Sequence, residues 1–117
     1  MLYYNHRKEE IQKGVLSMFK KSKYLITSRE NGNIVFKEKE GYSFSVNGHE
    51  FGICKRGNAW DITEISSGLF VTIVLKRKDA IEEIKRITPS IEAALKNSDN
   101  KKFIKMVKQE YEKRSQR

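Results

Sequence analysis

The 117-residue sequence has few of the residues that organise disulfide-linked folds or metal sites. It contains one cysteine, two histidines and one proline. A single cysteine excludes an internal disulfide framework and a cysteine-rich metal cluster. The longest apolar run, residues 69–75, includes Thr72 and is far too short to span a bilayer. Charges recur through residues 1–23, so this segment lacks the apolar core of a signal peptide. We expect one cytoplasmic domain.

Signatures of catalysis are also missing. His49 and Cys54 are five positions apart on one expected strand, which directs them to opposite faces. Asp61 and Glu64 are three apart and diverge in the same way, so they form no carboxylate pair. No phosphate-binding glycine loop and no Gly-x-Ser-x-Gly elbow is present. We therefore expect a protein without enzymatic activity, cofactor or metal.

Turn signals and alternation indicate a β-meander in the middle of the chain. Large apolar residues alternate with serines over residues 42–46, a pattern typical of a half-buried strand. Shorter strands are expected at Tyr24–Thr27 and Asn33–Lys39. Four dipeptides predict the turns between strands: Asn31-Gly32, Asn47-Gly48, Gly57-Asn58 and Ser67-Gly68.

Two-residue turns at these positions also predict the register. Phe44 falls opposite Phe51, and Ile53 falls opposite Ile62. The third hairpin would place Ile62 opposite Ile73 and Trp60 opposite Leu75, leaving Val74 and Phe70 on the other face. One face then collects eight apolar residues: Tyr42, Phe44, Phe51, Ile53, Trp60, Ile62, Ile73 and Leu75. An antiparallel sheet with one core face follows.

Amphipathic helices are predicted on both sides of the meander. Apolar residues recur at helical spacing over residues 6–20. A second helix opens at Asp79 and ends at Thr88-Pro89, because the residue before proline avoids helical angles. A short helix starts at Ser90, and after a break at 97–100 a last helix spans Lys101–Arg114. The expected fold is α+β: an N-terminal helix, an antiparallel meander of five or six strands, and C-terminal helices on one sheet face, with the last few residues frayed.

Charge is distributed unevenly along the chain. The formal net charge is +9, with +4 in residues 1–23, −1 in 24–75 and +6 in 76–117. A positive field attracts phosphate backbones or acidic protein surfaces. The alternative explanation is that the charge serves solubility alone.

The basic residues of the C-terminal third are the candidate binding site. Lys101, Lys105 and Lys108 form a stripe at i, i+4 and i+7 on the last helix. The full candidate set is Lys76, Arg77, Lys78, Lys85, Arg86, Lys101, Lys102, Lys105 and Lys108. We expect basic residues from both termini to converge on one continuous electropositive surface. The large aromatics of the meander fall on the core face, which argues against a base-stacking platform.

A short pattern suggests a biological setting. It consists of Trp60-Asp61-Ile62-Thr63-Glu64, Ser67-Gly68-Leu69 and Lys76-Arg77-Lys78-Asp79-Ala80. This stretch, about one fifth of the chain, resembles small uncharacterised proteins of Gram-positive phages and mobile elements. The resemblance implies an accessory protein that works in the cytoplasm of a host bacterial cell.

Two partner hypotheses follow from charge and setting. In the first, the protein binds nucleic acid through its basic helices. In the second, it is an inhibitor that docks on a host defence protein or nucleoprotein complex, as anti-CRISPR proteins do. A membrane partner is not expected, because the basic helices lack a Trp- or Leu-rich face. Pairing of an edge strand, Tyr24–Thr27 or Leu69–Leu75, would produce a homo-oligomer.

Overall fold

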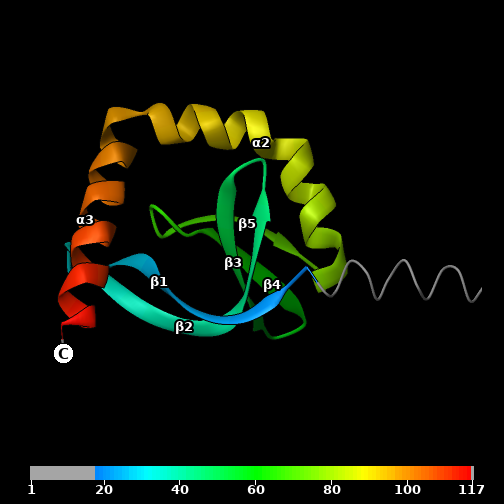
Figure 1. Ribbon diagram of the computed structural model, residues 1–117, viewed down its shortest axis with the longest axis horizontal. Helices are drawn as coiled ribbons and strands as arrows, with labels where there is room; N and C mark the ends of the chain where they lie inside the picture. Colours follow the sequence, from blue (N-terminus) through cyan, green and yellow to red (C-terminus); the bar gives the residue numbers. More distant parts are fainter. Residues whose placement is uncertain (1–17, 117) are drawn as a thin grey trace, which may run out of the picture.

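A computed structural model describes residues 18–116 as a five-stranded antiparallel sheet followed by helices (Figure 1). The strand order is β1-β2-β3-β4-β5, so each strand pairs with its neighbours in sequence. The elements are β1 (Lys20–Glu30), β2 (Asn33–Val46), β3 (His49–Arg56), β4 (Ala59–Glu64), β5 (Leu69–Val74), the 3-10 helix η1 (Arg77–Asp79), α2 (Ala80–Lys96) and α3 (Ser98–Ser115). The α+β class and the meander are confirmed.

The helix predicted over residues 6–20 lies mostly outside the described residues. For the end of this segment that the structure describes, the prediction is wrong, because Met18 lies in a turn and β1 begins at Lys20. Phe19 is buried instead by the sheet, with its ring centroid 5.1 Å from that of Phe44. Aromatic packing onto the sheet therefore fixes the entry into β1.

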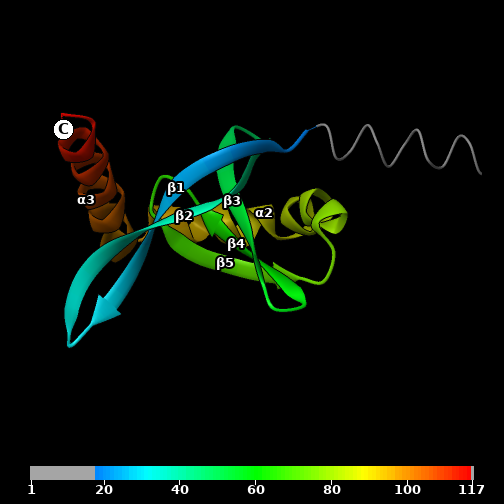
Figure 2. The same cartoon turned by 90° about the horizontal axis from the view of Figure 1, so that it is seen from below.

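The strands predicted at 33–39 and 42–46 are one continuous strand, β2, of 14 residues. Gly41 does not interrupt it. A Cβ at Gly41 would lie 2.2 Å from the Ile53 carbonyl oxygen, so the glycine permits a close approach of strands rather than a break. The strand count is consequently five, and β1 and β2 form a long hairpin that projects from the body (Figure 2).

Two of the three predicted registers are confirmed. Phe44 pairs with Phe51 across the β2–β3 hairpin, and Ile53 pairs with Ile62 across the β3–β4 hairpin. Asn47 adopts a positive φ of 51°, as its turn requires. The pattern of apolar residues and the turn chemistry agree at both hairpins.

The predicted β4–β5 register is wrong. Ile62 pairs with Thr72 and Trp60 with Val74, with an irregularity between Ile62 and Thr63. Val74 is therefore buried, whereas Ile73 and Leu75 are exposed. The turn occupies four residues, 65–68, instead of two. A register change of this size moves side chains to the opposite face.

A buried carboxylate builds that longer turn. Glu64 is 3% exposed. Its Oε1 accepts hydrogen bonds from the Ser67 amide at 3.0 Å and the Ser67 hydroxyl at 2.7 Å, and its Oε2 accepts from the Ser66 amide at 3.0 Å. Charge-assisted bonds to two successive residues hold the backbone in the turn. The turn then meets β1, where the Thr27 amide donates to the Gly68 carbonyl at 2.7 Å. The sheet is coiled, so that β1 contacts the turn that leads into β5.

The helices cover the sheet loosely, and α2 supplies most of the contact. Ala80, Ile81, Ile84 and Ile91 from α2 join the core formed by the strands. Among the described residues of α3, only Val107 is buried. The expectation of helices on one face holds for α2, while α3 lies beside β1 at one end of the sheet (Figures 1 and 2).

The helix boundaries predicted near residues 88 and 97 are wrong. α2 continues through Pro89 to Lys96, and Figure 1 shows it changing direction along its length. Proline removes one helical amide and favours such a bend, and the Thr88 hydroxyl donates to the Ile84 carbonyl at 2.8 Å beside it. The expected break at 97–100 shrinks to Asn97, whose side chain caps α3 by accepting from the Asp99 amide at 2.9 Å.

Candidate nucleic-acid interface

The α3 lysines form the first group of candidate residues. Lys101, Lys102, Lys105 and Lys108 are all exposed. None of them makes an ion pair within residues 18–116. Residues 101–108 contain no Asp or Glu. The predicted lysine stripe is therefore present as a run of four free cations on one helix.

The C-terminal end of α3 is anchored to the sheet. The Leu25 amide donates to the Tyr111 hydroxyl at 2.7 Å, and Arg114 donates to the Phe36 carbonyl at 3.0 Å. Burial raises the pKa of Tyr111, while the hydrogen bond from Leu25 opposes that shift. Both contacts come from the last turns of α3, after Lys108, and they leave the four lysines exposed.

The second group lies at η1, where β5 leads into α2. Lys76 and Lys78 make no ion pair in the described part of the chain. Arg77 is engaged differently: its guanidinium lies 3.9 Å from the centroid of the Tyr42 ring and 5.6 Å from that of Trp60. Such cation–π contacts stabilise the junction by about 0.5–2 kcal/mol each. Arg77 thus joins η1 to the sheet.

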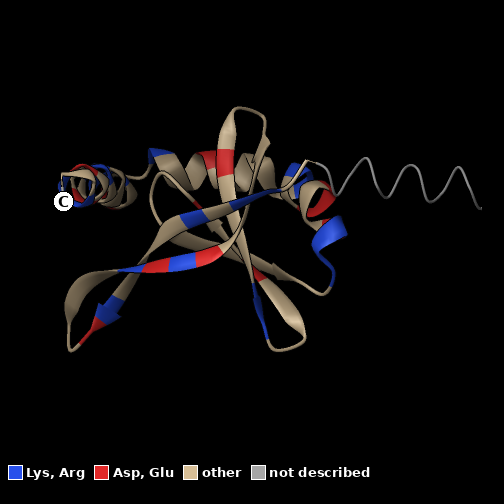
Figure 3. Cartoon of the chain, turned by 60° about the horizontal axis from the view of Figure 1, so that its bottom comes forward, with Lys and Arg blue, Asp and Glu red and all other residues tan. Residues whose placement is uncertain are grey.

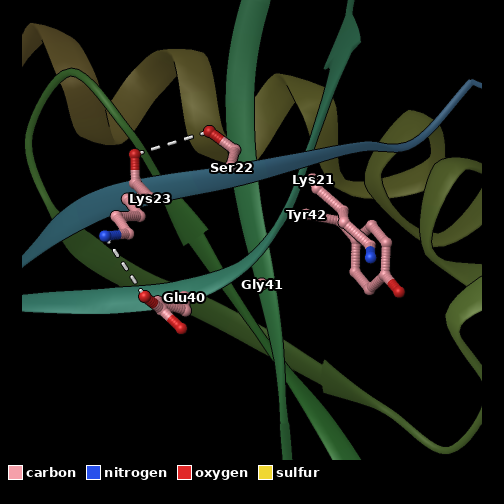
Figure 4. Close-up of a pocket in the computed structure, with 6 residues that line it drawn as sticks. All are labelled: Lys21, Ser22, Lys23, Glu40, Gly41 and Tyr42. Carbon is pink, nitrogen blue, oxygen red and sulfur yellow. Dashed lines mark hydrogen bonds and ion pairs between the residues drawn. The ribbon is translucent and has the colours of Figure 1, made fainter.

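A shallow hollow beside Tyr42 adds cations that the sequence analysis did not select. Lys21 is the cross-strand partner of Tyr42, and Figure 4 shows their side chains together on one side of the hairpin. Lys23, across the hollow, forms an ion pair with Glu40 at 3.3 Å. The sequence analysis missed Lys21 because its position next to Tyr42 depends on a pairing of β1 with β2 that extends beyond the strand predicted at Tyr24–Thr27.

Lys85 and Arg86, on α2, are neutralised by their own helix. Lys85 lies 3.5 Å from Glu82, and Arg86 forms a bidentate pair with Glu83. The hydrogen bond from Arg86 lowers the pKa of Glu83 and the same contact raises the pKa of Arg86. Two of the nine predicted binding residues therefore have acidic partners.

The two free groups do not merge. η1 precedes α2 and lies at the opposite end of the molecule from α3 in two perpendicular views (Figures 1 and 2). Figure 3 shows basic and acidic residues interspersed along β1 and β2 between them. The expected continuous electropositive surface is thus divided into an α3 group and an η1 group.

The aromatics near η1 are not a free stacking platform. Phe44 and Phe51 are buried and stack on each other with centroids 5.5 Å apart. Tyr42 and Trp60 are partly exposed, but Arg77 already covers the Tyr42 ring. Stacking of bases would require displacement of that guanidinium.

The candidate catalytic residues have local partners. His49 Nε2 lies 3.3 Å from a Glu92 carboxylate oxygen on α2. Arg56 makes a bidentate contact with Asp61. Cys54 is partly buried, and burial together with this neighbouring thiol raises the pKa of Tyr24. Within residues 18–116 no three His, Cys, Asp or Glu side chains lie close enough to hold a metal ion.

The fold and the site define a small five-stranded antiparallel meander with two C-terminal helices, the last of which carries a free lysine stripe. The chain matches no protein-family model, no curated protein and no solved structure. In the described residues, no helix is long and apolar enough to cross a membrane.

Proposed function

We propose that this protein binds nucleic acid without catalysing a reaction, and that the α3 lysines contact the phosphate backbone. The observation that carries the proposal is the run of four exposed lysines at residues 101–108, which make no ion pair with any described residue and have no acidic residue among them. The resemblance of residues 60–80 to phage proteins supports an accessory role in a phage or mobile element.

The spacing of the stripe suits a polyanion. Residues 101 and 108 are separated by about 10 Å along the helix axis. Duplex DNA carries about six phosphate charges over that length. Flexible lysine side chains neutralise such charges without reading bases, so we expect little sequence preference. Release of bound counterions then drives the association.

Paired and unpaired lysines give a matched comparison. Lys101→Gln, Lys105→Gln and Lys108→Gln together remove three free charges, whereas Lys85→Gln with Arg86→Gln removes two charges that already have acidic partners. Binding to a labelled duplex and a labelled single strand is measured by fluorescence anisotropy at several salt concentrations. The slope of log affinity against log salt is negative, and each lost phosphate contact reduces its magnitude by about 0.9 for duplex DNA.

The α3 triple variant is expected to make that slope less steep by about 2.7, and the α2 double variant to leave it nearly unchanged. Equal effects of the two variants would refute the assignment to α3. A pull-down from host lysate that retains one specific protein after nuclease treatment would instead favour docking on a host complex.

A further inference from the structure

The sheet has two edge strands, and within the described residues only β1 is capped. On β1 the Leu25 amide donates to the Tyr111 hydroxyl, and the Thr27 amide donates to the Gly68 carbonyl. On β5 no residue from Phe70 to Leu75 has a hydrogen bond to any described element other than β4. β5, the last strand of the sheet (Figure 2), therefore has backbone N–H and C=O groups along its outer side that have no partner among residues 18–116.

Part of β5 also lacks the usual protection of an edge. Edge strands are commonly blunted by charges, by proline or by a bulge. β5 reads LFVTIV, with no charge and no proline. Its one irregularity is a bulge at Val71, which has no partner in the register, and the residues from Thr72 to Val74 beyond it are regularly paired. The edge is thus competent for further strand pairing.

Exposed apolar side chains gather at this edge. Phe70 is 60% exposed, Ile73 45% and Leu75 78%. Of the large hydrophobic residues in the described chain that are exposed, Met18 alone lies elsewhere. Apolar surface concentrated next to free backbone groups is typical of an interface.

We propose that β5 pairs antiparallel with β5 of a second copy of this chain, which joins the two sheets across a two-fold axis. The partner strand must be extended, apolar and uncharged, and a second β5 meets each requirement. If the strands cross near Ile73, the two Lys76 side chains start about 20 Å apart, well beyond the Debye length of about 8 Å at physiological salt. The net charge of +9 therefore opposes this contact only weakly. Both α3 helices, which lie beside β1, remain open.

Sedimentation velocity of the full chain without nucleic acid tests the pairing over micromolar to submillimolar concentrations. We expect a monomer–dimer equilibrium that does not weaken when salt is raised from about 0.15 M to about 1 M, because no pair of opposite charges holds this contact together. Ile73→Lys with Leu75→Lys, or Leu75→Lys alone, is expected to give a folded monomer, with the fold checked by circular dichroism. Lys101→Gln with Lys105→Gln serves as the control at the other end of the molecule and should still dimerise.

Hydrogen exchange provides a measurement that needs no variant. The amides of residues 70–75 should gain protection as concentration rises. A monomer at every concentration, or a dimer that the lysine variants do not affect, would overturn the proposal. A dimer that dissociates in high salt would also overturn it, because that behaviour identifies a contact between charged groups. None of these outcomes bears on binding by α3, which is measured separately.

Discussion

Removal of the Glu64 carboxylate should destabilise the β4–β5 turn more than any substitution of an exposed residue. In Glu64→Ala, the Ser67 amide loses its acceptor, and the Ser67 hydroxyl keeps only the backbone carbonyl oxygen of residue 64 at 3.5 Å, in a position that is 1% exposed. A buried polar group left without a partner costs about 1–3 kcal/mol, so the expected loss is about 3 kcal/mol for the amide and the weakened hydroxyl together. Glu64→Gln keeps one oxygen and is expected to cost about 2 kcal/mol.

Urea denaturation followed by circular dichroism measures these losses, provided that the m-value stays constant. The two serines supply an internal comparison. Ser67→Ala removes a buried hydroxyl, whereas Ser66→Ala removes an exposed one, so the first should cost clearly more. If Glu64→Ala costs less than about 1 kcal/mol, the carboxylate does not organise the turn and our explanation of the β5 register fails.

Three further predictions concern the sheet. Arg77→Ala should lower the free energy of unfolding by about 1–2 kcal/mol in thermal denaturation, because the contacts of the guanidinium with Tyr42 and Trp60 are lost. An equal loss on substitution of a neighbouring lysine would contradict this prediction. Burial raises the pKa of Tyr24, so the folded state keeps the phenol proton at a pH at which the unfolded chain has lost it. The free energy of unfolding should therefore fall by about 1.4 kcal/mol per pH unit above pH 10. Alkaline denaturation curves of Tyr24→Phe should show a smaller decline. The same variant should be neutral or stabilising at pH 7, because the buried Tyr24 hydroxyl has no hydrogen-bond partner among residues 18–116. Gly52→Ala should prevent stable folding or cost several kcal/mol in urea denaturation, because the added Cβ would lie 2.5 Å from the Tyr24 ring, and a stable variant would show that the ring moves freely.

Local turn chemistry made the centre of the sheet predictable. The Asn47-Gly48 and Gly57-Asn58 turns each specify a two-residue loop, and alternating side chains then fix the pairing of β2, β3 and β4. The register of the β4–β5 hairpin was predicted wrongly because the Glu64 side chain accepts hydrogen bonds from Ser66 and Ser67 and lengthens the turn. Such a carboxylate is indistinguishable in sequence from the acidic residues of a solvated strand.

Helix boundaries and charge pairing showed the same limit. Pro89 was expected to end a helix, but packing of Ile84 and Ile91 on the same core holds both sides of it in α2. The acidic partners of Lys85 and Arg86 stand three positions earlier in the sequence, so this neutralisation was readable from spacing. The separation of the η1 and α3 groups could not be predicted from the sequence, because it depends on the path that α2 takes across the sheet.

The salt dependence of wild-type binding tests the central claim most directly. Four lysine–phosphate contacts predict a slope of about −3.6 in log affinity against log salt, which is about a 150-fold loss of affinity for duplex DNA between 50 and 200 mM. Absence of binding at the lower salt, or a loss of less than about fourfold over that range, would contradict phosphate contact by the α3 stripe.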